Sequence, residues 1–245
     1  MAIGAVTLWL LGYPEQAVQC SRQAVLLARE LSHPNTLALA LHFAAMVHQY
    51  RREVPITQER AEAALAIATE QGFSFWSAGG TVLRGWALAA QGAGGRAQLQ
   101  QGLDAWQATG SLTYRTYYLA LLTEALHNAG RTEEALSVLA EAHALVRTTE
   151  ERFHEAELYR LQGELLLAAG RGEAEACFRQ ALAVARRQEA RSLELRAAVS
   201  LSRLLRQQGN RQEARALLAE TYGWFTEGFE TSDLKEARAT LESLA

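Results

Sequence analysis

The sequence has few residues that break helices or cross-link a chain. It contains 2 cysteines and 3 prolines in 245 residues, and Pro14, Pro34 and Pro55 all lie in the first quarter. Proline therefore interrupts no helix from Ile56 onward. The formal net charge is −3, so the chain lacks a general positive field, and we expect neither a nucleic acid nor a membrane as its partner.

The two cysteines lie in matching segments, Ala17–Ala24 and Ala174–Ala181. Such distant parts of a stacked protein do not come close enough to form a disulfide. We therefore interpret Cys20 and Cys177 as small core residues with free thiols. This is typical of a reducing compartment and predicts a cytoplasmic location.

The apolar stretch Ala2–Leu11 is too short to span a bilayer, and it lacks the basic region and cleavage site of a signal peptide. It resembles the last turns of a helix whose beginning is missing. We expect the chain to be a fragment, or the C-terminal part, of a longer protein.

A two-helix unit recurs along the chain with a step of about 39 residues. Its copies share a turn glycine followed by small or apolar residues at helical spacing. These copies are Gly170–Ala174–Phe178–Ala181, Gly209–Ala214–Leu218–Thr221, Gly130–Ala135–Leu139–Ala142 and Gly12–Ala17–Ser21–Ala24. A repeat of this length predicts a stack of helical hairpins, in which each hairpin buries its apolar face on its neighbours.

Apolar residues recur at spacings of three and four, as on one face of a helix, and no segment alternates with period two over the length of a strand. We therefore predict an all-α protein, a right-handed superhelical stack of antiparallel helix pairs that forms one domain. The expected pairs are 1–31, 34–71, 73–109, 112–149, 151–189 and 192–226, followed by a capping helix at 233–244.

Turn residues support this division. A glycine that can adopt the left-handed conformation is expected after the first helix of most pairs, at Gly12, Gly92, Gly130, Gly170 and Gly209. The second pair has Arg51-Arg52-Glu53 at this place and no glycine. At the start of the last helix, Asp233 with Glu236 has the spacing of a capping box.

The fifth pair resembles a tetratricopeptide unit. Its signature positions are occupied by Gly163, Leu166, Gly170, Ala174, Phe178 and Ala181, with one residue deleted in the turn. The usual closing proline is absent, and the step is longer than the usual 34 residues. This departure resembles the long-helix variant of large bacterial regulators.

A second resemblance extends over nearly the whole chain. It is carried by five segments, which are Leu8–Pro14, Leu83–Ala89, Glu155–Arg160, Ser192–Ala198 and Tyr222–Phe229. These segments resemble the C-terminal helical region of bacterial proteins that couple a class III adenylyl/guanylyl cyclase to a signal-transduction ATPase. The cyclase and ATPase modules of such proteins lie upstream, so the resemblance implies a regulatory or partner-sensing arm without their activities.

In tetratricopeptide stacks the first helices of the pairs line a concave surface. Projected from the turn glycines, the predicted lining is aromatic in the middle and charged towards the C-terminus. It consists of His42, Met46, Gln49, Trp76, Trp86, Tyr117, Glu124, His127, Glu157, Arg160, Glu164, Arg196, Arg203 and Arg206. Aromatic and arginine side chains are the types that most often anchor a protein partner.

The same residues have a purely structural interpretation, which the sequence leaves open. Trp86 and Tyr117 also suit packing between neighbouring first helices. Glu157 lies three residues before Arg160, and it can pair with that residue or with Arg196 on the next repeat. Exposed pairs of this kind contribute only about 0.2–1 kcal/mol and need not indicate function.

No pattern of a catalytic or metal site is present in the sequence, and no cofactor is expected. The run Gly92–Gly95 has the glycine content of a phosphate-binding loop, but it lacks the Gly-Lys-Ser/Thr ending and is interpreted as a turn. His42 and His48 are six residues apart and fall on different faces of a helix.

We therefore expect a non-enzymatic scaffold or regulatory arm that binds a protein segment, or a neighbouring domain of its parent protein, in the concave groove. The alternative is a domain that senses a small molecule and controls an upstream ATPase or cyclase module. An enclosed pocket lined by Trp76, Trp86 and Tyr117 would favour the alternative, whereas a wide groove would favour the scaffold. The sequence leaves the oligomeric state open.

Overall fold

The computed structural model describes residues 1–244, which fold into thirteen α-helices. The first helices of the successive pairs are α1 (Ala2–Leu10), α3 (Pro34–Tyr50), α5 (Ser74–Ala90), α7 (Arg115–Asn128), α9 (Glu155–Ala168) and α11 (Arg191–Gln207). Their partners are α2 (Pro14–Glu30), α4 (Val54–Gln71), α6 (Arg96–Ala108), α8 (Thr132–Thr149), α10 (Ala174–Arg187) and α12 (Arg211–Gly223), and α13 (Ser232–Glu242) ends the stack.

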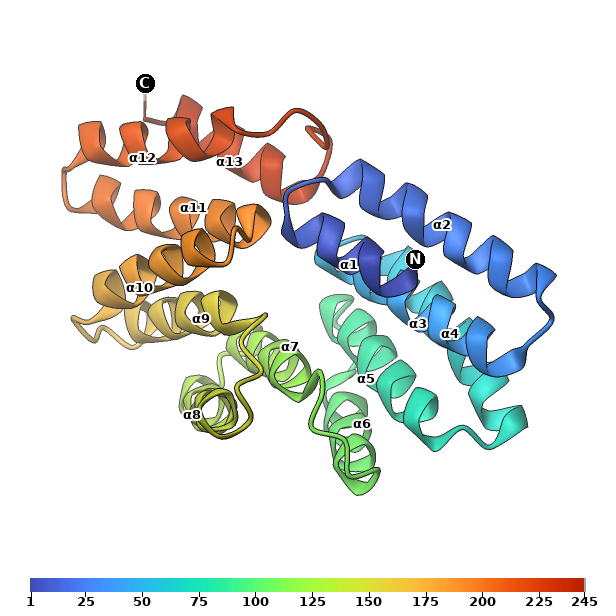
Figure 1. Cartoon of the computed structure of the whole chain (residues 1–245). Helices are drawn as coiled ribbons and strands as arrows, with labels where there is room; N and C mark the ends of the chain where they lie inside the picture. Colours follow the sequence, from blue (N-terminus) through green and yellow to red (C-terminus); the bar gives the residue numbers. More distant parts are fainter. Residues whose placement is uncertain (245) are drawn as a thin grey trace.

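The predicted fold class is confirmed. Each helix packs against the helices next to it in the chain, as in a helical repeat (Figure 1). The turn glycines adopt the left-handed conformation, with φ between +66° at Gly170 and +92° at Gly12. In the second pair Arg52 takes the same conformation, with φ +59°, so the glycine-free turn keeps the geometry of the others. Cys20 and Cys177 are free thiols packed partly against the core.

The first helices form an inner row that closes on itself. Each contacts the next along the row, from α1 through α3, α5, α7 and α9 to α11, and α11 in turn contacts α1. The two ends of the stack therefore lie side by side, with α1 against α11 and the start of α2 against the segment between α12 and α13 (Figure 1). The partner helices lie outside this row and bury only one face each.

The turn between α1 and α2 packs against the segment between α12 and α13, and this seam holds the row closed. The Glu227 carboxylate accepts the backbone N–H groups of Glu15 at 2.9 Å and Gln16 at 3.1 Å, which are unpaired donors at the start of α2. The Trp224 ring packs against the backbone of Gly12, where a Cβ atom would lie 2.5 Å from the ring. A remote carboxylate thus caps α2 and fixes the two ends together.

We predict that Glu227→Ala weakens this seam. Loss of the acceptor for two N–H groups at the start of a helix costs about 1 kcal/mol, which corresponds to roughly fivefold faster amide hydrogen exchange at Glu15 and Gln16. Glu230→Ala is the matched control, because the Glu230 carboxylate pairs only with exposed Lys235. Equal exchange at these amides in both variants would contradict the assigned role of Glu227.

Close packing explains why a glycine occupies position 163 of the tetratricopeptide-like unit. A Cβ atom on Gly163 in α9 would lie 2.4 Å from the ring of Phe178 in α10, whereas one on Gly172 would meet nothing within 4 Å. Phe178 is fully buried, so its ring has little space to move away. The small residue lets the two helices of the pair approach closely.

Gly163→Ala is therefore expected to lower the free energy of unfolding by about 1–3 kcal/mol, as overpacking does in a tight core. Gly172→Ala should change it by no more than about 0.5 kcal/mol. Urea denaturation followed by circular dichroism measures both. If the two alanine variants were equally stable, the close contact with Phe178 would not limit residue 163.

The predicted capping box at the last helix is wrong. The helix α13 begins at Ser232, one residue earlier than expected, and no side chain caps it. Asp233 instead accepts a hydrogen bond from Arg196 at 2.8 Å and lies 3.3 Å from the Arg52 guanidinium, while Glu236 pairs with Arg203. Opposite charges on α11 and on the turn after α3 attract these carboxylates away from the helix start. No helix among residues 1–244 combines the length and apolar character needed to cross a membrane.

Candidate functional site

The residues predicted to line the concave surface do face one another on the inner row, but most of them are packed rather than open. Nine are buried, which are His42, Met46, Gln49, Trp76, Trp86, Tyr117, Glu157, Arg160 and Arg196. Glu124, His127, Glu164 and Arg206 are half-buried, and Arg203 is exposed. Because the row closes, α3 and α11 meet α7 and α9, and their side chains fill the space in which a groove was expected.

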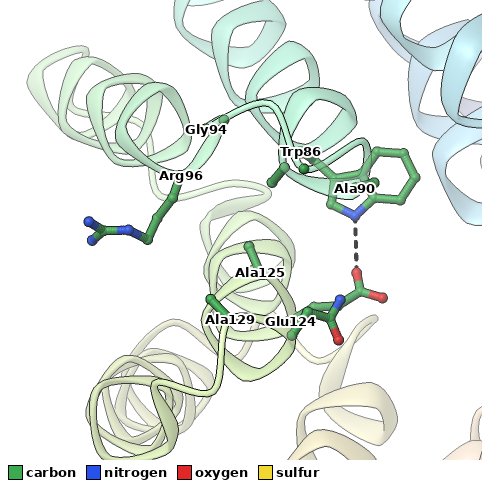
Figure 2. A pocket seen from close by; sticks show the side chains of 11 residues that line it. Trp86, Ala90, Gly94, Arg96, Glu124, Ala125 and Ala129 are labelled. Carbon is green, nitrogen blue, oxygen red and sulfur yellow. Dashed lines mark hydrogen bonds between the residues drawn. The ribbon is translucent and has the colours of Figure 1, made fainter.

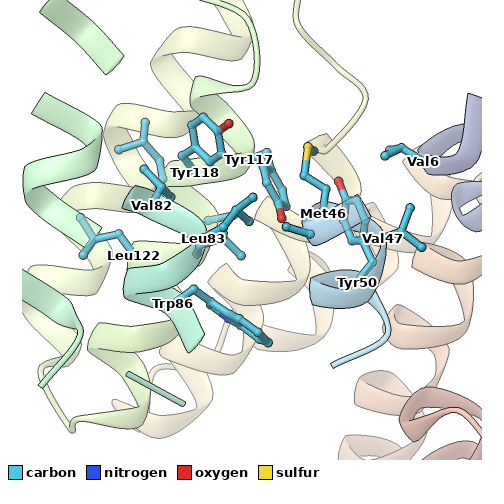
Figure 3. Packing of buried hydrophobic residues seen from close by; sticks show 14 of the residues in the cluster. Val6, Met46, Val47, Tyr50, Val82, Leu83, Trp86, Tyr117, Tyr118 and Leu122 are labelled. Atoms are coloured by element: carbon cyan, nitrogen blue, oxygen red, sulfur yellow. The ribbon is translucent and has the colours of Figure 1, made fainter. Parts of the chain in front are cut away.

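Aromatic side chains from α3, α5 and α7 pack together between the helices of the inner row (Figure 3). The Tyr117 hydroxyl donates to Gln49 at 2.8 Å, and the Tyr118 hydroxyl lies 3.0 Å from Nε2 of His42. Tyr50 stacks on Trp9 of α1 with ring centroids 4.3 Å apart. Tyr117, Gln49 and His42 thus pack and hydrogen-bond within the core, which is the structural interpretation of these residues. Nδ1 of His42 and the Tyr50 hydroxyl are buried there without a hydrogen-bond partner among residues 1–244.

A charge network lies beside this aromatic core. The Arg160 guanidinium donates to both carboxylate oxygens of Glu157, at 2.9 and 2.7 Å, and contacts Glu164 at 3.4 Å. Burial alone would raise the pKa of Glu157, but the charges of Arg160 and Arg196 outweigh it and hold that pKa at about 2. The charged part of the predicted lining is therefore engaged within the protein.

Two histidines are buried in the neutral form. Burial lowers the pKa of His42 from 6.5 to about 3. It also lowers the pKa of His154 to about 4, although the nearby Glu157 carboxylate opposes the change. The unfolded chain thus takes up protons near pH 6.5 that the folded chain accepts only in much stronger acid, so folding is favoured above pH 6.5 and weakened as the pH falls below it.

For His42 alone this linkage removes about 2 kcal/mol of stability between pH 6.5 and pH 5. We expect His42→Gln, whose amide can still accept a hydrogen bond from Tyr118, to lose less stability than the wild type over this interval. Urea denaturation at pH 7 and at pH 5 measures the difference. An identical loss in both proteins would show that His42 is not held neutral by burial.

A cleft remains open beside the inner row, at the ends of α5 and α7. It has a volume of ≈ 380 Å³ and lies between the end of α5, the start of α6 and the end of α7 (Figure 2). Trp86 and Glu124 line its polar side, and Nε1 of Trp86 donates to the Glu124 carboxylate at 3.0 Å. The rest of the wall is made of Arg96, Asn128 and small residues, which are Ala89, Ala90, Gly92, Gly94, Gly95, Ala125 and Ala129.

The turn between α5 and α6 shapes this cleft. Gly92 and Gly94 have positive φ, and a Cβ atom on Gly95 would lie 2.1 Å from the backbone oxygen of Gly85. The run is a helix–helix turn that packs its backbone tightly on α5, and not a loop after a strand. Among residues 1–244 no group of three or more His, Cys, Asp or Glu side chains is placed to hold a metal ion.

Trp86 and Glu124 are predicted from the sequence to face the inner row, and the structure brings them together in the cleft. Trp76 and Tyr117 do not line the cleft and lie in the aromatic core. Arg96, Asn128 and the alanines of the last turns of α5 and α7 were missed. Their only signal was the concentration of small residues around the Gly92–Gly95 turn. A scan against models of known protein families found no match for this chain, and a search of curated proteins found none either.

Proposed function

We propose that the protein is a non-enzymatic binding module that receives a protein segment, or a neighbouring domain of its parent protein, at the cleft between α5 and α7. The observation that carries the proposal is the Trp86–Glu124 pair, which places a polar group in an accessible hollow with small apolar walls. Most of the other inner-row residues expected to line a groove are buried against one another.

The resemblance of five segments to the C-terminal region of bacterial cyclase–ATPase regulators supports a regulatory role for this binding. On this proposal the stack is a tetratricopeptide-like arm that works in the cytoplasm, and the segment it binds belongs to a signalling partner or to an upstream module. A closed ring suits such an arm, since a preformed site loses little conformational entropy when it binds.

A small-molecule sensor is the second candidate. The volume of the cleft, ≈ 380 Å³, lies within the range of small-molecule sites, which is about 300–1,000 Å³. Of the three aromatic residues expected to line a sensor pocket, only Trp86 does so. The protein-binding proposal is therefore preferred.

Selection of a random peptide library displayed on phage against the purified protein tests the proposal. Ala90 is exposed and lines the cleft, so Ala90→Trp fills it, and we expect the selected peptides to bind this variant at least about tenfold more weakly, a loss near 1.4 kcal/mol. Ala66→Trp is the matched control, because Ala66 is an exposed alanine of a shallow hollow on the outer helix α4.

The proposal fails if no peptide is enriched, or if the selected peptides bind both tryptophan variants as well as the wild type. Enrichment of no peptide, together with a small molecule that raises the melting temperature of the wild type but not of Ala90→Trp, would instead support the sensor. Circular dichroism checks that both variants keep their helix content.

A further inference from the structure

We propose that the cleft selects a positively charged side chain, a lysine or an arginine of the bound segment, and that Glu124 holds its charged group. This inference rests on the proposed binding function and names the chemistry of the partner. It follows from three features of the cleft, which are an unpaired carboxylate, two helix ends of negative polarity and a small apolar wall.

Glu124 is a half-buried carboxylate without an ion pair. Neighbouring carboxylates on the inner row have an arginine partner, as Glu157 and Glu164 do in Arg160. The charge of Glu124 also attracts Arg160, but no cation among residues 1–244 lies within ion-pair distance of it, and its one hydrogen bond comes from the neutral indole of Trp86. A half-buried charge without a close partner is unfavourable, so a cation entering the cleft would be stabilised there.

Two helix C-termini face the same space. Ala89 and Ala90 belong to the last turn of α5, and Ala125 and Asn128 belong to that of α7. A helix C-terminus carries a partial negative charge, which favours cations. The carbonyls of Ala89 and Ala125 accept N–H groups of the turns that follow, and each keeps a second lone pair. The N-terminus of α6 also borders the cleft and carries a partial positive charge. Two helix C-termini and the Glu124 carboxylate together place more negative charge there.

The side chains in the cleft leave room for an aliphatic stem. The wall between the two helix ends is made of alanines, and the Arg96 guanidinium points away from Glu124 (Figure 2). Trp86 is almost fully buried, and its N–H orients one carboxylate oxygen of Glu124. A lysine or arginine can thus lay its methylene groups on the alanines while its charged end reaches Glu124. In this arrangement Glu124 binds the cation and Trp86 is a positioning residue.

The test uses peptides selected against the full chain, in which one lysine or arginine is replaced by a neutral side chain of similar shape, norleucine for lysine and citrulline for arginine. We expect one such replacement to weaken binding to the wild type at least tenfold, as measured by fluorescence anisotropy. Glu124→Gln should weaken the unmodified peptide to a similar extent, although its amide oxygen can still accept the Trp86 hydrogen bond. Added salt should weaken the wild-type complex and have little effect on the variant.

Glu62→Gln is the matched control, since Glu62 is an exposed carboxylate of another hollow and already pairs with Arg84. It should leave the affinity unchanged. The inference is overturned if the selected peptides contain no essential cation, or if Glu124→Gln binds as well as the wild type while Ala90→Trp does not bind. The second result would leave the proposed binding function standing. If Glu124→Gln failed to fold, the neutral peptides on the wild type would decide alone.

Discussion

Arg196 is the residue on which the closed form of the stack depends. From α11 its guanidinium donates to the backbone oxygen of Tyr50 in α3 at 2.6 Å and to Asp233 in α13 at 2.8 Å. It also lies 3.6 Å from Glu157 in α9 and 4.9 Å from the centre of the Trp9 ring in α1. One buried cation thus joins helices from the beginning, middle and end of the chain. Removing it would take the donor from the Tyr50 carbonyl oxygen and leave Asp233 with Arg52 and Glu157 with Arg160 as their remaining cations. The loss of a donor to a buried carbonyl oxygen is costly in a protein interior.

Closure changes what the inner row can do. In an open solenoid the first helices present a concave surface to a ligand, whereas here the same helices present their side chains to one another. His42 and Gln49 hydrogen-bond to tyrosines of α7 within the core, and Arg160 is neutralised beside it. Surface for binding therefore remains where the row is less tightly filled, at the ends of α5 and α7. This is why the candidate site is a local cleft and not a groove along the whole stack.

The helices and their turns could be predicted from the sequence because both are local properties. A glycine at the end of an apolar periodic segment determines a turn within a few residues, and Gly170 behaves as predicted. Closure could not be predicted in this way, because it depends on small rotations that accumulate over successive repeats. The role of Asp233 depends on tertiary packing in the same way, since Arg196 lies on the helix that α13 packs against and only closure brings Arg52 near. Trp86 and Glu124 could be assigned to one wall, but their contact depends on how α5 and α7 pack.

The closed core and the cleft are linked through α7. One part of this helix carries Tyr117 and Tyr118, which are fully buried and hydrogen-bonded to α3, and its last turns carry Glu124 and Asn128. Because the tyrosines fix α7 against the core, and the Trp86 N–H fixes the carboxylate against α5, Glu124 is held in place before any ligand arrives. A binding site with preformed geometry spends less of its interaction energy on ordering its own side chains. The packing that removes the broad groove therefore also makes the remaining cleft a rigid site, and a closed stack is well suited to recognise one charged side chain.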